Sequence, residues 1–193
     1  MAATPSTMVD LGTTLPPFRL RDFNGKAVTS DDFGGSKGVL VAFICPHCPF
    51  VRHVRGEFAR LAQDFQQRGV AVIAINSNDV TAFPDDGPDG MRKEASEVGY
   101  TFSYLYDDTQ EVARSFRAAC TPDFFLFDDQ RRLVYRGQFD DSRPKSPVPV
   151  TGKDLKEAVD ALLAGRPVPA DQRPSLGCNI KWMQGAAPEY FRV

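Results

Sequence analysis

The stretch VLVAFICPHCP, residues 39–49, decides the fold. Its first half is a continuous apolar run, which is typical of a central β-strand buried on both faces. Its second half contains two cysteines separated by two residues, Cys45 and Cys48. The residues that follow have apolar side chains at spacings of three and four, as on one face of an amphipathic helix: Val51, Val54, Phe58, Leu61 and Phe65. The stretch therefore predicts a strand that leads through a Cys-x-x-Cys pair to the start of a helix.

This predicted position gives the two cysteines a chemical role. A helix N-terminus presents free N–H groups and a partial positive charge, which stabilise a thiolate, the reactive form of cysteine. We expect Cys45 to be an exposed nucleophile and Cys48 to be the resolving thiol of a redox-active disulfide that needs no further cofactor. Pro46 fits the first helical position, and His47 can place a donor or a positive charge near the Cys45 sulfur. Pro46 and His47 are therefore predicted to tune the redox potential.

The rest of the chain predicts an α/β domain around this strand. A second apolar run at residues 70–75 follows the helix, and strand–helix–strand in this order forms a right-handed unit with parallel strands. Asn24-Gly25 between two short strands predicts a hairpin near the N-terminus. Residues 123–139 predict a second hairpin, and an apolar face that begins at Leu155 predicts a last helix.

Length and composition limit the function classes. The 193 residues predict a flexible lead-in over residues 1–14 and a single domain over residues 15–193, with a C-terminal extension at residues 167–193. The net charge of −2 argues against a nucleic-acid partner. No apolar run approaches the roughly 20 residues that cross a membrane, and residues 1–10 do not read as a secretory signal, so we expect a cytoplasmic protein. Four cysteines are too few for a disulfide scaffold and indicate redox chemistry instead.

The order of the elements resembles the thioredoxin fold, and Thr121-Pro122 matches the position of that family's cis-proline. The N-terminal hairpin and the opening GxxLPxFxL at residues 12–20 are similar to the redoxin branch, which includes the ResA/TlpA-type reductases and the AhpC/TSA peroxiredoxins. The motifs CPHCPFV, CTPDFF, GQFDDSRP and GCNIKW are similar to a group of bacterial thioredoxin-family proteins. The resemblance implies a central mixed sheet flanked by helices. It also implies thiol–disulfide exchange with protein or small thiol and disulfide substrates, together with a reducing or oxidising partner.

The resemblance also implies roles for single residues. The Thr121 backbone and the Pro122 ring are expected to bind the substrate, with Thr121 pairing like a strand. Pro46-His47 is the pair found in the oxidising DsbA-type enzymes, so we predict an intermediate or oxidising potential, and the direction of exchange stays open. Val39 and Val51 stand where related families carry an acid, which leaves the base for the resolving thiol unidentified.

Two other functions compete with thiol–disulfide exchange. A peroxiredoxin-type peroxidase usually has a Thr three residues before its reactive cysteine, and this chain has Ala42 there. A redox-inactive adaptor or metal-binding module is the other alternative. Zinc could use Cys45 and Cys48 with His47 or His53, but ligands within one turn rarely give tetrahedral geometry, so we predict no metal.

Two further cysteines and two acidic pairs have open roles. Cys120 and Cys178 are either buried free thiols or a second redox pair, the latter if the C-terminal extension folds back near Thr121-Pro122. The pairs at residues 85–86 and 140–141 are most simply solvated loops. Residues 140–143 alternatively line the rim of a substrate site.

Overall fold

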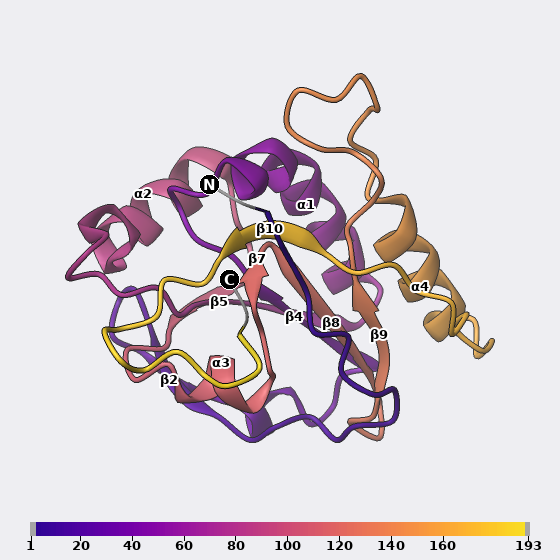
Figure 1. Ribbon diagram of the computed structural model, residues 1–193. Helices are drawn as coiled ribbons and strands as arrows, with labels where there is room; N and C mark the ends of the chain where they lie inside the picture. Colours follow the sequence, from indigo (N-terminus) through magenta and orange to yellow (C-terminus); the bar gives the residue numbers. More distant parts are fainter. Residues whose placement is uncertain (1–2, 192–193) are drawn as a thin grey trace.

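The computed structural model describes residues 3–191 and is built around a seven-stranded mixed sheet (Figure 1). The strands follow the order β3-β2-β6-β5-β4-β8-β9. β4 lies in the middle and pairs parallel with β5 and antiparallel with β8. The bounds are β2 (Arg19–Asp22), β3 (Ala27–Thr29), β4 (Gly38–Phe43), β5 (Val70–Asn76), β6 (Ser103–Tyr106), β8 (Asp123–Asp128) and β9 (Leu133–Gly137). The central mixed sheet and both predicted hairpins are therefore confirmed.

The helices cover both faces of the sheet. Their bounds are α1 (Pro49–Gln67), α2 (Pro88–Val98), α3 (Glu111–Ser115) and α4 (Lys153–Leu163), with 3-10 turns η1 (Ser30–Phe33) and η2 (Pro84–Asp86). The predicted apolar face of α1 is confirmed, because all five of its predicted side chains are buried. Among residues 3–191, no helix combines the length and the apolarity that crossing a membrane requires.

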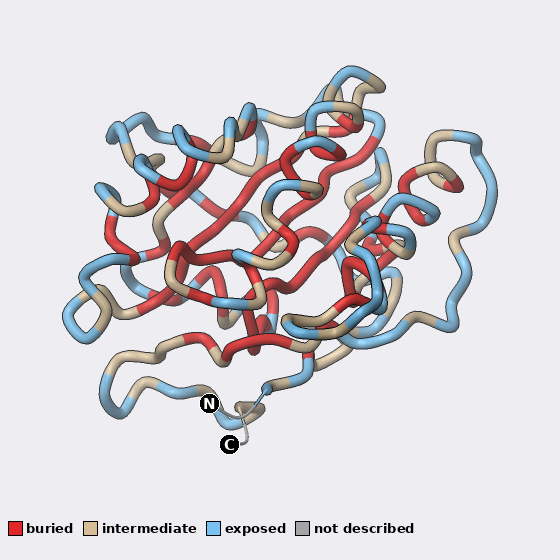
Figure 2. Tube along the Cα trace, turned by 90° about the horizontal axis from the view of Figure 1, so that it is seen from above, coloured by how far each residue is buried: buried red, intermediate tan, exposed pale blue. Residues whose placement is uncertain are grey.

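Strand β4 supplies two separate cores because its side chains alternate between the two faces of the sheet. Leu40 and Ala42 join the core beneath α1, α2 and α4, whereas Val41 and Phe43 join the core on the side of α3 and the N-terminal hairpin. Figure 2 shows the central strands as the buried interior of the molecule. Burial on both faces explains why the strand reads as an unbroken apolar run. It also makes the end of β4, where the cysteines follow, a rigidly held point.

A second, three-stranded sheet crosses the first one at the end of β4. Its order is β1-β10-β7, where β1 is Thr4–Pro5, β7 is Cys120–Thr121 and β10 is Leu176–Asn179. In Figure 1 the yellow strand β10 passes over the middle of the molecule between these two partners. The sequence showed neither end of the chain as a strand, because two- to four-residue strands carry too short an alternation to recognise.

The expectation of a flexible lead-in over residues 1–14 is wrong for the described part of that segment. Residues 4–5 pair with β10, Gly12 donates a backbone hydrogen bond of 2.8 Å to Leu133, and Thr13 accepts one of 2.8 Å from Leu133. Residues 1–2 lie outside the described part. The lead-in is held by backbone pairing with β10 and the β8–β9 hairpin, which side-chain patterns do not reveal.

Candidate functional site

The two cysteines of the Cys-x-x-Cys pair lie between the end of β4 and the start of α1. Cys45 comes two residues after the end of β4, and Cys48 is the N-cap residue of α1. The first helical position is occupied by Pro49, whose missing N–H costs nothing there. The expectation that Pro46 begins the helix is wrong, because Pro46 and His47 form a turn before it. Cys48, rather than Cys45, therefore meets the free N–H groups of the helix.

The Thr121-Pro122 segment is brought against both sulfurs. The peptide bond between Thr121 and Pro122 is cis, as the motif predicted. The Cys45 Sγ lies 3.5 Å from the Thr121 Oγ1, and the Cys48 thiol donates a hydrogen bond of 3.2 Å to the Thr121 carbonyl. Residues that are 73 or more positions apart in the sequence thus form one cluster.

The cysteines are covered, not exposed. Cys45 and Cys48 each have an exposed fraction of 0%. The expectation of an exposed nucleophile is wrong because strand β10 lies over the site and pairs with Thr121, with Cys178 directly opposite it. The backbone of Thr121 is therefore already paired with the chain's own C-terminal segment. The predicted docking of a substrate strand at Thr121 requires that β10 first move away.

A buried carboxylate fixes His47. Asp86 has an exposed fraction of 0% and accepts a hydrogen bond of 3.0 Å from the His47 backbone N–H and one of 2.8 Å from the Asn78 side chain. Its second contact with His47 is to the ring Nδ1. The opposite side of the ring packs on Phe83, with ring centroids 5.0 Å apart and planes nearly parallel. The expectation that Asp86 belongs to a solvated loop is wrong, since η2 turns it inward beneath His47.

The environment of Cys45 disfavours its thiolate. Burial, a hydrogen bond with Cys48 and the negative charge of Asp86 raise the pKa of Cys45 well above its usual value. The His47 Nδ1 lies 3.9 Å from the Cys45 Sγ, within reach of a proton exchanged with it. The prediction of a low Cys45 pKa is therefore wrong for the closed site.

The environment of Cys48 favours its thiolate. Burial opposes ionisation, but interactions with the side chains of Cys178, Cys45 and Thr121 and with the backbone of Val51 outweigh it and lower the pKa of Cys48. Of the two thiols, Cys48 is therefore the more acidic.

Cys120 and Cys178 do not form the second pair that was one of their two predicted roles. All four cysteines are free thiols and buried. Cys178 lies opposite Thr121, whereas Cys120 lies opposite Asn179. Since neighbouring side chains of a strand point to opposite faces, Cys120 and Cys178 lie on opposite faces of the two-stranded ladder. Cys178 faces the Cys45–Cys48 site, and Cys120 faces away from it.

One group of side chains has the composition of a metal site. The Cys45 Sγ, the His47 Nδ1 and a carboxylate oxygen of Asp86 all lie within 4.8 Å of one another. Thiolate, imidazole and carboxylate are zinc ligands, and three protein ligands leave a fourth position open. The sequence did not show this donor set, because Asp86 is distant in the chain from the motif.

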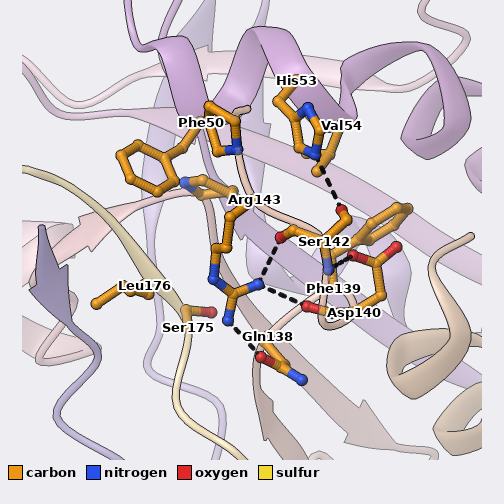
Figure 3. Close-up of a pocket in the computed structure, with 12 residues that line it drawn as sticks. Phe50, His53, Val54, Gln138, Phe139, Asp140, Ser142, Arg143, Ser175 and Leu176 are labelled. Atoms are coloured by element: carbon orange, nitrogen blue, oxygen red, sulfur yellow. Dashed lines mark hydrogen bonds between the residues drawn. The ribbon is translucent and has the colours of Figure 1, made fainter. Parts of the chain in front are cut away.

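A small pocket has Pro122 in its lining (Figure 3). Arg143 points into it and donates hydrogen bonds to the Asp140 and Ser142 carbonyls. His53, on α1, lies 3.1 Å from the Ser142 hydroxyl. The pocket is lined by Phe50, His53, Val54, Pro122, Gln138, Phe139, Asp140, Ser142, Arg143, Pro144, Ser175 and Leu176. Asp140 is buried, and its carboxylate accepts a hydrogen bond from the backbone N–H of Ser142. The expectation of a solvated loop is therefore wrong for this residue.

The fold, the Cys-x-x-Cys pair at the end of β4 and the cis-proline opposite it define a thioredoxin-fold redoxin. The AhpC/TSA family profile matches residues 11–136. The chain belongs to the AhpC/TSA family.

Relatives with assigned activities cover about two thirds of the chain. It is 27% identical over 130 residues to thiol-disulfide oxidoreductase ResA from Geobacillus thermodenitrificans, which covers 67% of this chain and 70% of that protein. It is 29% identical over 136 residues to alkyl hydroperoxide reductase E from Mycobacterium tuberculosis, covering 68% and 78%. The crystal structure of an uncharacterized conserved protein from Geobacillus kaustophilus superimposes with a TM-score of 0.94 at 52% identity, covering 96% and 99%.

Proposed function

We propose that the protein is a thiol–disulfide oxidoreductase that cycles Cys45 and Cys48 between a dithiol and a disulfide. The observation that carries the proposal is the convergence of both sulfurs on Thr121, at 3.5 Å for Cys45 and 3.2 Å for Cys48. The similarity to a protein named thiol-disulfide oxidoreductase ResA supports the same reaction class.

The reaction divides between the two cysteines. Cys45 attacks one sulfur of a target disulfide, which forms a mixed disulfide and releases the other target sulfur as a thiolate. The Cys48 thiolate then attacks the Cys45 Sγ, which closes the Cys45–Cys48 disulfide and releases the reduced target. Two electrons pass from the protein to the target, and a thiol partner returns them. The same steps in reverse oxidise a dithiol.

The His47 Nδ1 lies 3.9 Å from the Cys45 Sγ and is placed to accept the proton that Cys45 must lose before it attacks. Cys48, whose pKa is lowered, is the weaker base and supplies the thiolate of the second step. Stabilising a thiolate on Cys48 stabilises the reduced protein, which makes the disulfide more oxidising. This supports the predicted intermediate or oxidising potential.

The test is the reduction of insulin by dithiothreitol. We expect the wild type to accelerate it and Cys45→Ser and Cys48→Ser each to lower the rate at least tenfold. Cys120→Ser is the matched control, because Cys120 is equally buried but faces away from the site. Equal activity of the wild type and Cys45→Ser would refute the proposal.

A peroxidase is a second candidate, favoured by the closure of the site. A peroxide can reach a buried thiol more easily than a protein disulfide can, and a relative is named alkyl hydroperoxide reductase E. Cys45 would attack the peroxide to give a sulfenic acid and an alcohol, and Cys48 would release water as the disulfide forms. Stopped-flow mixing with hydrogen peroxide tests this: rapid oxidation that survives Cys48→Ser but not Cys45→Ser supports it, and slow oxidation of the wild type excludes it.

A further inference from the structure

Strand β10 places a third thiol in the redox site. Cys178 lies opposite Thr121 in the β7–β10 ladder, and its backbone neighbours hold it there. The approach is close: a Cβ on Gly177 would stand 2.0 Å from the Thr121 carbonyl oxygen, so only a glycine fits before Cys178. The strand is thus shaped to bring Cys178 against the cis-proline segment.

Cys48 is the central member of a row of three sulfurs. Cys45, Cys48 and Cys178 belong to one buried cluster, and the side chains of both neighbours lower the pKa of Cys48. Cys48 also contacts the carbonyl of Thr121, the residue that faces Cys178 across the ladder. A sulfur flanked in this way can form a disulfide with either neighbour.

Strand β10, which carries Cys178 and covers the site, is held by hydrogen bonds of its flanking residues on both sides. The Ser6 N–H donates to Ser175 at 3.0 Å on one side of β10. On the other side, the Lys181 N–H donates to the Asn78 side chain at 2.8 Å, and Asp79 donates to the Lys181 carbonyl at 2.8 Å. Cys178 is therefore held beside Cys48 at a high effective concentration, which favours it over an external thiol.

We propose that Cys178 is a third redox-active thiol, which exchanges disulfide with Cys48. This rests on the proposed function, because the Cys45–Cys48 disulfide supplies the oxidising equivalents. The Cys178 thiolate attacks the Cys48 Sγ, the Cys45–Cys48 bond breaks, and Cys45 leaves as a thiolate that takes up the proton lost by Cys178. One disulfide is exchanged for another, so no external oxidant or reductant is consumed.

The exchange has two consequences for the site. A Cys48–Cys178 disulfide joins β10 covalently to the N-terminus of α1, which locks the cover in place. It also returns Cys45 to the thiol state, although the protein neither gains nor loses electrons. Cys178 would in this way store the oxidised state while the site stays closed.

The experiment maps disulfides after oxidation in a glutathione buffer, acid quenching and alkylation of free thiols. In the wild type we expect two species, one with Cys45–Cys48 and one with Cys48–Cys178 and an alkylated Cys45. In Cys45→Ser we expect the Cys48–Cys178 link within one chain. Cys45→Ser/Cys120→Ser should give the same link, and Cys45→Ser/Cys178→Ser should leave Cys48 free or glutathionylated.

The outcomes separate this proposal from the redox function itself. Wild type that carries only Cys45–Cys48, or Cys45→Ser that lacks the Cys48–Cys178 link, overturns the role of Cys178 and leaves the proposed function intact. Wild type that forms neither disulfide overturns the proposed function. Circular dichroism verifies that each variant is folded, and Cys45→Ala replaces Cys45→Ser if the serine variant unfolds.

Discussion

Cys120 and Cys178 are neighbours on two paired strands, yet the structure gives them opposite surroundings. Both are buried, and their positions differ by a single step along the ladder. Cys178 lies opposite Thr121 in the cluster that holds Cys45 and Cys48, whereas Cys120 has the buried Asp123 carboxyl as a neighbour. The difference shows that the face of the strand on which a side chain lies, rather than its proximity in the fold, decides which thiol takes part in the site.

The largest expected effect comes from breaking the ladder that holds Cys178. Gly177→Ala places a Cβ against the Thr121 carbonyl, which is backbone and cannot rotate away. We expect a loss of roughly 1–3 kcal/mol in the free energy of unfolding and at least a tenfold faster reaction of Cys45 and Cys178 with a thiol reagent.

Gly56→Ala is the matched control for this substitution. Gly56 lies on the exposed side of α1, and nothing stands within 4 Å of an added Cβ there. It should stabilise the protein by about 0.5–1 kcal/mol and leave thiol reactivity unchanged. Equal thiol reactivity of Gly177→Ala and wild type would contradict the view that β10 closes the site.

The second prediction removes the group that holds the turn between the cysteines. Asp86→Ala deprives the His47 and Asn78 donors of their buried acceptor. We expect a loss of about 1–3 kcal/mol in chemical denaturation, because buried donors without partners are costly. It should also lower the pKa of Cys45, since the Asp86 charge raises it. A Cys45 pKa unchanged by the substitution would contradict the assigned role.

The third prediction concerns the side of the ladder that Cys120 faces. Burial raises the pKa of Asp123 to about 8. A raised carboxyl pKa means that the folded state keeps a proton that the unfolded state has lost, so stability falls as the pH rises from about 4 to about 8. Between pH 6 and pH 7.5 the wild type should lose roughly 1–2 kcal/mol relative to Asp123→Asn, as measured by urea unfolding at each pH. Parallel pH profiles of the two proteins would count against this assignment.

The smallest expected effect is a change in the pKa of Cys48 when either Cys178 or Cys120 is removed. Cys178→Ala removes a hydrogen bond that lowers the pKa of Cys48, so that pKa should rise. Cys120→Ala should leave it unchanged, since Cys120 lies on the opposite face of the ladder. Ultraviolet thiolate absorbance against pH measures both. A larger change in Cys120→Ala than in Cys178→Ala would reverse the assignment of the two thiols.

Much of the fold was predictable from the sequence because it depends on long or strongly patterned segments. Burial on both faces makes β4 and β5 continuous apolar runs, and the apolar face of α1 repeats over five turns. Asn24-Gly25 marked the N-terminal hairpin because this pair favours a tight turn between two strands. The ends of the chain were missed, because β1 and β10 are short and are held by backbone pairing.

The site was only partly predictable. The motif identified Cys45, Cys48 and Thr121-Pro122, whose chemistry is local. The position of Cys48 as N-cap depends on where the helix begins, and the turn at Pro46 moved that point by three residues. Asp86 could have been suspected from its place in the loop after β5, since the carboxyl ends of adjacent parallel strands meet at one edge. The burial of that loop, however, is set by tertiary contacts with Asn78 and His47.

The central claim is that Cys45 and Cys48 form a redox couple beneath strand β10. Equilibration in glutathione buffers of graded ratio, followed by acid quenching, alkylation and mass spectrometry, tests it most directly. We predict a two-electron transition, at a potential less reducing than thioredoxin's roughly −270 mV, in which the Cys45–Cys48 disulfide appears, alone or in exchange with Cys48–Cys178, while Cys120 stays alkylated. A protein in which Cys45 and Cys48 remain free thiols throughout, or a midpoint as reducing as that of thioredoxin, would contradict the claim.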